Sequence, residues 1–252
     1  MRQPDIPSPG PERVGIGSTL RGALSLYREE LLRIALASLA IFIPIDVVTV
    51  ALHAVEARVI EQRDPSILWI VEVTGVITYF LVTFGQVFLC GVLDELVGAK
   101  IEGEPLPGLR EVLRKLRFGR LLAADVLISI VTAIAGALLV GPGIVSFALF
   151  GITGPVINIE DRRAVDAMRR SVRLVFPHLW TAIAVIAVPL GIELAVDHWY
   201  LARTEGAGLG VIVGVSVVLT LTVRALVALL EVVLGNLLIR GDHAVSATSP
   251  AE

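Results

Sequence analysis

An uncharged stretch of 34 residues runs from Val126 to Ile159 and reads VLISIVTAIAGALLVGPGIVSFALFGITGPVINI. As one straight helix it would be about 51 Å long at ~1.5 Å per residue, whereas the hydrocarbon core of a bilayer is about 30 Å thick. Gly141, Pro142 and Gly143 lie near its middle. Because proline removes a helical hydrogen bond and glycine permits turn dihedrals, we predict a helix break at these three residues.

Both flanks of this stretch are cationic. Basic residues cluster in residues 110–120 before it and in residues 162–173 after it. Cationic flanks favour the cytoplasmic side of a membrane, so a single kinked crossing would place one cluster on the wrong side. A hairpin or a re-entrant loop keeps both clusters inside. Since each arm is long enough to span, we predict two membrane-spanning helices with Gly141–Gly143 at the outer face.

The composition of the whole chain also indicates a membrane protein. Apolar residues make up 55% and charged residues 18% of the chain, against roughly 45–50% and about 25% in soluble domains. A mean hydropathy of +0.82 excludes a disordered chain as well. The single cysteine, Cys90, excludes a disulfide framework and a cysteine-based metal site. The net charge of −3 does not indicate a nucleic-acid partner, and we expect no cofactor.

Six apolar segments predict an all-α, polytopic helical bundle within residues 17–240, flanked by disordered cytoplasmic tails at 1–16 and 241–252. With both termini in the cytoplasm, 17 of the 21 lysines and arginines fall on the inner side, as the positive-inside rule requires. We therefore expect a multi-pass protein of a bacterial cytoplasmic membrane. The predicted spans are 34–55, 67–92, 121–140, 143–159, 179–196 and 209–239.

A basic, helix-periodic segment precedes each odd-numbered span, at about 20–33, 109–117 and 165–175. Each segment predicts a helix in the cytoplasmic interface, with its apolar face in lipid and its cations toward anionic headgroups. The recurrence fits an internal threefold repeat, although loops between spans are commonly basic in any case. The cations expected to contact anionic lipid are Arg114, Lys115, Arg117, Arg169, Arg170 and Arg173.

Short motifs after Gly141 resemble a group of bacterial multi-pass proteins, namely the membrane domain of some glycerophosphodiester phosphodiesterases and its free-standing relatives. The matching elements are Pro142-Gly143-Ile144, Pro155-Val156, Glu160, and the spaced set Ala167, Ser171 and Leu174. The resemblance covers residues 120–180 in detail. It implies a helical integral membrane protein and no particular reaction, because the phosphodiesterase activity belongs to a separate soluble barrel that this chain cannot contain.

Ionisable residues inside the predicted spans are the candidate functional residues. Each costs about 2.5–3.5 kcal/mol near the bilayer centre, so such residues usually face the protein interior and have partners. They form either a charged cavity for an ion, a proton or a headgroup, or buried pairs that fix helix packing. For Arg224 we predict a carboxylate partner, Glu231 or Glu193. The complete set is Asp46, Glu72, Glu193, Arg224 and Glu231.

Catalytic motifs give no support to an enzyme. No HExxH, GxGD or Walker A motif occurs, and Glu29-Glu30 followed by Arg33 misses the EExxxR spacing of glutamate-type intramembrane proteases by one residue. The leading hypothesis is a non-enzymatic membrane protein that interacts with lipids or partner membrane proteins. The alternatives are a transporter or permease component, with an ATPase as partner, and an intramembrane enzyme acting on lipid.

Overall fold

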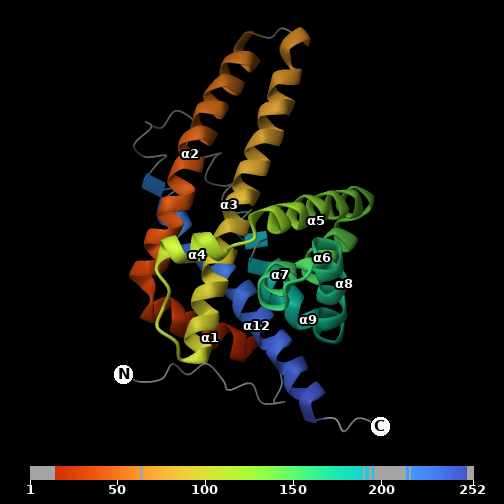
Figure 1. Ribbon diagram of the computed structural model, residues 1–252. Helices are drawn as coiled ribbons and strands as arrows, with labels where there is room; N and C mark the ends of the chain where they lie inside the picture. The colour runs from red at the N-terminus through yellow and green to blue at the C-terminus, as the bar shows by residue number, and fades with distance from the viewer. Residues whose placement is uncertain are drawn as a thin grey trace.

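A computed structural model describes residues 15–62, 65–189, 191–192, 195, 214–215 and 217–248, and every regular element in these ranges is helical (Figure 1). Helix α1, Ile16–Glu29, leads into α2, Leu31–Gln62. A short turn, η1 (Pro65–Ile67), connects α2 to α3, Trp69–Glu102. Helices α2 and α3 thus form a long hairpin that projects beyond the other elements (Figure 1).

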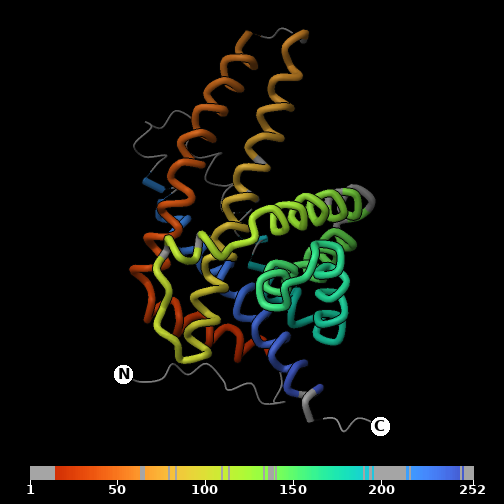
Figure 2. The backbone as a smooth tube through the Cα atoms, in the orientation of Figure 1, coloured from red at the N-terminus to blue at the C-terminus, as the bar shows by residue number. Residues whose placement is uncertain are grey.

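The shorter elements gather beside one half of this hairpin (Figure 2). They are α4 (Leu109–Lys115), α5 (Phe118–Leu138), α6 (Val140–Phe150), α7 (Thr153–Glu160), α8 (Ala164–Val175), the turn η2 (Phe176–His178), α9 (Leu179–Ala182), the π-helical turns η3 (Ile183–Ala187) and η4 (Thr220–Arg224), and α12 (Ala225–Thr248).

Among the described residues, four helical segments are long and apolar enough to cross a membrane: Leu31–Gln62, Trp69–Glu102, Gly141–Glu160 and Val217–Ala244. Large apolar side chains such as Val48, Val76 and Phe80 are exposed on the hairpin. Both observations are consistent with a protein embedded in lipid. Helix α5, the third predicted span, is not among the four, and it lies across α3 in Figure 1 rather than alongside it. The fifth predicted span lies partly outside the described residues, so the count of six remains a prediction.

The break in the 34-residue stretch comes two residues before the predicted turn. Leu139 has an extended backbone (φ −160°, ψ 142°) and separates α5 from α6. Gly141, Pro142 and Gly143 belong to the first turn of α6. Pro142 is the third residue of α6, where a backbone N–H would have no partner within the helix, so the proline is tolerated without loss of a hydrogen bond, and the next N–H, of Gly143, donates to the Leu139 carbonyl at 3.3 Å. A second break follows at Gly151 and Ile152.

The C-terminal boundary was also predicted wrongly, because α12 continues to Thr248 where we expected a disordered tail from residue 241. Two contacts hold this extension. Arg170 pairs with Asp242 at 2.6 Å, and His243 lies 3.3 Å from Glu160. Charged residues do not end a helix by themselves, and a hydropathy pattern therefore placed the end too early.

Two of the three predicted interfacial helices turn their buried faces toward the bundle. The buried residues of α1 include Ala23 and Leu26, and those of α8 include Ala167, Ser171 and Leu174. Both helices contact α12, and α8 also contacts α5, α6 and α7. Of the residues expected to face lipid, Ala23 of α1 and Val175 of α8 are buried, whereas Leu20 and Val165 are 42% and 51% exposed, so the prediction is wrong for Ala23 and Val175.

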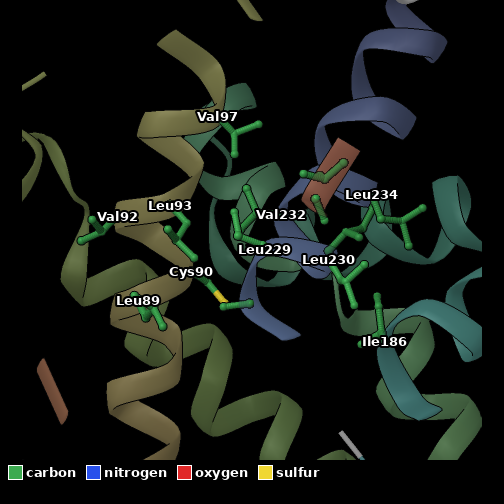
Figure 3. Packing of buried hydrophobic residues seen from close by; sticks show 14 of the residues in the cluster. Leu89, Cys90, Val92, Leu93, Val97, Ile186, Leu229, Leu230, Val232 and Leu234 are labelled. Atoms are coloured by element: carbon green, nitrogen blue, oxygen red, sulfur yellow. The ribbon is translucent and has the colours of Figure 1, made fainter. Parts of the chain in front are cut away.

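The core lies where α12 meets α3. Leu89 and Leu93 of α3 lie near Leu229 and Val232 of α12, and all four are buried (Figure 3). Ile186 of η3 packs on the opposite side of α12 (Figure 3). A helix with apolar residues around its whole circumference is typical of the centre of a bundle. Helix α12 has this central position, and Asn236, a polar residue in its middle, is 1% exposed.

Candidate functional site

Four polar contacts follow one another along α12, and we call them the polar column. They are Arg224–Asp46, Glu231–Cys90, Asn236–Asp94 and Arg240–Glu102. The last three partners belong to α3 and follow the same order along the chain as their α12 residues. Helices α3 and α12 therefore pack in parallel, with the column between them.

Arg224 pairs with Asp46 of α2, with Nη1 and Oδ1 3.6 Å apart. The guanidinium also lies over the ring of Phe42, 5.1 Å from its centroid, and the arginine is only 8% exposed. Asp46 lies about midway along the apolar part of α2. The prediction of a carboxylate partner is therefore confirmed, but Glu231 as that partner is wrong, and Glu193 lies outside the described residues.

The π-helical turn η4 explains why Arg224 does not lie on the same helix face as Glu231, as regular α-helical spacing would predict. It spans Thr220–Arg224 and adds a residue to the turn, which rotates Arg224 relative to the α-helical face that carries Glu231. The Tyr27 hydroxyl of α1 donates a hydrogen bond to the Leu221 carbonyl in this turn. Burial raises the pKa of Tyr27. The Tyr27 side chain of α1 therefore supports η4.

The remaining two sequence candidates behave differently from each other. Glu231 faces α3, where the Cys90 thiol donates to its Oε2 at 3.7 Å. Glu72 lies exposed in the first turn of α3 and does not join the polar column. The nearby Thr74 hydroxyl instead donates to Glu56 of α2 at 2.6 Å, which fastens the far end of the hairpin.

The most enclosed polar contact in the column was not predicted from the sequence. Asn236 donates from Nδ2 to Asp94 Oδ1 at 2.8 Å, and the two residues are 1% and 4% exposed. A third residue, Asp125 of α5, is also buried and was not singled out. The predicted second span ended at residue 92, which placed Asp94 outside it. The i,i+4 spacing of Cys90 and Asp94 was the available signal, because on an unbroken helix it places both residues on the same face.

Ion pairs outside the polar column join the two ends of each of two helical segments, residues 31–102 and residues 118–160. We call these segments excursions. Lys100, near the end of α3, contacts Glu29 and Glu30, just before α2, at 3.0 and 3.1 Å. Asp161, just after α7, contacts Arg117 and Arg120 at the start of α5. Each excursion, 31–102 and 118–160, therefore returns to the side from which it began. The two basic flanks of the 34-residue stretch do lie together.

Several residues of the motifs after Gly141 are buried or paired, whereas Pro142 and Ile144 are exposed. Ala167 and Val156 are fully buried, and the Ser171 hydroxyl donates to the Leu149 carbonyl at 2.7 Å. Pro155 packs directly on Gly235 of α12. Glu160 pairs with Arg162, Arg170 and His243. These contacts connect α7, α8 and α12.

The six cations predicted to contact lipid fall into two groups. Lys115 pairs with Glu111, Arg117 with Asp161, and Arg170 with Glu160 and Asp242. Burial alone would lower the pKa of Arg170, but its bonds to these two carboxylates raise it overall. Arg114, Arg169 and Arg173 are exposed and have no carboxylate partner within the described part of the chain.

No family model, curated protein or solved structure matches this chain. The resemblance to the phosphodiesterase membrane domain therefore remains a prediction. Among the residues described, no group of three or more His, Cys, Asp or Glu side chains could hold a metal ion.

Proposed function

We propose that this chain is a polytopic protein of a bacterial cytoplasmic membrane that associates with anionic lipid through one face of α8 and the turn after it. The observation that carries the proposal is a row of exposed side chains, Arg169, Arg173, Phe176 and Trp180, which we call the interfacial surface. Phe176 and Trp180 are 68% and 81% exposed.

The spacing and chemistry of this row support membrane contact. Arg169 and Arg173 are one α-helical turn apart on α8, and the exposed rings of Phe176 and Trp180 follow directly in the turn η2 and at the start of α9. Tryptophan is enriched at headgroup depth, and an adjacent arginine attracts anionic lipid by about 1 kcal/mol. Arg169 and Arg173 are available for this contact because the neighbouring Arg170 takes up the nearby carboxylates.

The double substitution R169Q/R173Q should weaken the preference for anionic lipid. Two surface cations correspond to about 2 kcal/mol, or roughly 30-fold in local affinity at low salt. The fluorescence of Trp180 reports this lipid preference once Trp69 and Trp199, the two other tryptophans, are replaced by Phe. In nanodiscs of mixed lipid, brominated phosphatidylglycerol should quench Trp180 more than brominated phosphatidylcholine does, and the double substitution should remove that difference.

Arg170→Gln is the matched control, because it removes an adjacent arginine that is held by Glu160 and Asp242. It should lower the thermal stability and leave the lipid preference of Trp180 unchanged. If the two brominated lipids quench Trp180 equally in the protein that retains Arg169 and Arg173, the proposal is wrong.

The proposal places the start of α2, the end of α3 and all of α8 on the cytoplasmic side. In a Cys90→Ala background, an impermeant maleimide should label Gln62→Cys in intact protoplasts, but label Arg169→Cys only after permeabilisation. Gly141→Cys tests whether residues 118–160 cross the membrane, because it should be labelled in intact protoplasts if they do. Labelling of Arg169→Cys in intact protoplasts would refute this topology.

Transport is the second candidate function, and the polar column is the observation that favours it. Ionisable residues inside a membrane often line the path of an ion or proton. The column runs from Arg224 and Asp46 in the middle of the hairpin to Arg240 and Glu102 near its end. It gives a transported cation several polar groups in sequence, although the same contacts also fix the packing of α12.

A further inference from the structure

Packing on one side of α8 fixes the direction in which its two exposed arginines point. Ala167 and Ser171 are buried on the side that faces the bundle, and the Ser171 hydroxyl donates to the Leu149 carbonyl of α6 at 2.7 Å. Since an α-helix turns once every 3.6 residues, Arg169 and Arg173 lie on the opposite side. Helix α8 itself lies at the side of the bundle remote from α2 (Figure 1). Both guanidinium groups therefore face away from the protein.

The nearby carboxylates leave these two positive charges uncompensated. Arg170, on the adjacent face of α8, pairs with Glu160 at 3.1 Å and with Asp242 at 2.6 Å. Asp166 is exposed earlier on α8, but no carboxylate in the described part of the chain forms an ion pair with either exposed arginine. The two charges are therefore available to anionic groups of another molecule.

The helix sets the distance between the two charges. Residues four apart are neighbours on a helix surface and lie about 6 Å apart along the axis at ~1.5 Å per residue. Two separate monophosphate lipids brought this close repel each other. Two phosphates joined by a three-carbon bridge already lie within about 6–8 Å of each other in the free lipid, because only six covalent bonds separate the phosphorus atoms. The arginine pair therefore favours a ligand with two linked phosphates.

We propose that Arg169 and Arg173 bind the two phosphates of one diphosphatidylglycerol molecule, in which a single glycerol links two phosphatidyl groups. Once one phosphate is bound, the second is held close to the other guanidinium, which raises its effective concentration there. The acyl chains lie beside the exposed rings of Phe176 and Trp180. This inference rests on the anionic-lipid contact proposed above and names the lipid class that the interfacial surface selects.

The test uses the full-length protein in nanodiscs, with Trp180 as its only tryptophan, as above. Brominated diphosphatidylglycerol is compared with brominated phosphatidylglycerol at equal phosphate content, so that the number of bromines per phosphate is the same. Half-maximal quenching of Trp180 should require about threefold less phosphate as diphosphatidylglycerol. Arg169→Gln or Arg173→Gln alone should remove this difference, because a single arginine gains nothing from the link between the phosphates. Each variant should keep part of the preference for phosphatidylglycerol over phosphatidylcholine.

A variant that changes the spacing but not the number of arginines is the matched control. Val165 is 51% exposed one turn before Arg169, so V165R/R169Q does not endanger folding. It keeps two arginines on the same side of α8 but places them about 12 Å apart along the axis. We expect this variant to prefer phosphatidylglycerol over phosphatidylcholine and to lose the advantage of diphosphatidylglycerol. If the advantage persists, the number of charges explains it and the proposal is overturned.

The three lipids separate failure of this inference from failure of the proposed function. In the protein that retains both arginines, equal quenching by diphosphatidylglycerol and phosphatidylglycerol, with both above phosphatidylcholine, refutes the linked-phosphate ligand and leaves the anionic-lipid contact in place. Equal quenching by all three lipids refutes both.

Discussion

Arg224→Gln should lower the thermal stability of the protein in detergent by an amount equivalent to about 3–5 kcal/mol. The guanidinium pairs with Asp46 at 3.6 Å and lies over the Phe42 ring. Removing one member of a buried pair leaves the other as an enclosed charge, and that uncompensated charge is the main penalty. Scanning fluorimetry in a single detergent would measure the loss.

The double substitution R224Q/D46N identifies the partner. It removes both charges and should recover much of the stability lost in Arg224→Gln, because no enclosed charge remains. R224Q/E231Q is the matched control, since Glu231 is the carboxylate that the helix period favours but contacts Cys90 instead. Recovery with E231Q and none with D46N would contradict the assignment of Asp46.

This pair also shows why sequence alone predicted the kind of partner but not its identity. The cost of a charge in lipid depends on residue type and depth, both of which can be read from sequence, and so a carboxylate was expected. The choice among carboxylates depended on the face that Arg224 presents. That face is set by η4, and nothing in a hydropathy pattern marks a π-helical turn.

The helix ends illustrate the same limit. The first two spans were predicted to end at residues 55 and 92, where apolar residues give way to charged ones, but α2 and α3 continue to Gln62 and Glu102. Hydropathy reports where lipid would end, whereas the backbone stays helical as long as its residues favour the helix. Asp94 was not predicted as a buried residue because the end of the apolar stretch at residue 92 was taken as the end of the helix.

The division among the six predicted lipid contacts could not have been foreseen either. Arg169, Arg170 and Arg173 belong to one basic segment, and composition treats them alike. Only the packing of α8 against α7 and α12 brings Glu160 and Asp242 to Arg170 and leaves its neighbours exposed. An electrostatic role depends on which charges remain without a partner, and that is a tertiary property.

Gly235→Ala is the second substitution for which we expect a large effect. A Cβ atom at Gly235 would lie 2.7 and 2.8 Å from Cγ and Cβ of Pro155. The proline ring cannot rotate away, so α7 and α12 must separate. Overpacking of this kind typically costs about 1–3 kcal/mol.

The separation should also disturb the contacts at the end of α7, because Glu160 pairs there with Arg170 and His243. Gly241→Ala is the control on the same helix, since no atom lies within 4 Å of a Cβ at that position. It should be neutral or stabilising by up to ~1 kcal/mol, as alanine favours the helix over glycine.

The double substitution G235A/P155A connects the loss to the specific contact. Replacing Pro155 by alanine removes Cγ, the ring atom closest to the new methyl group, but keeps Cβ, which would lie 2.8 Å from it, so the two helices need to separate less but do not return fully to their original distance. We therefore expect a smaller loss for the pair than for Gly235→Ala, measured as unfolding temperature in the same detergent. If Gly235→Ala and Gly241→Ala unfold at the same temperature, α7 and α12 are not in contact at this point, and Pro155 does not connect the two helices.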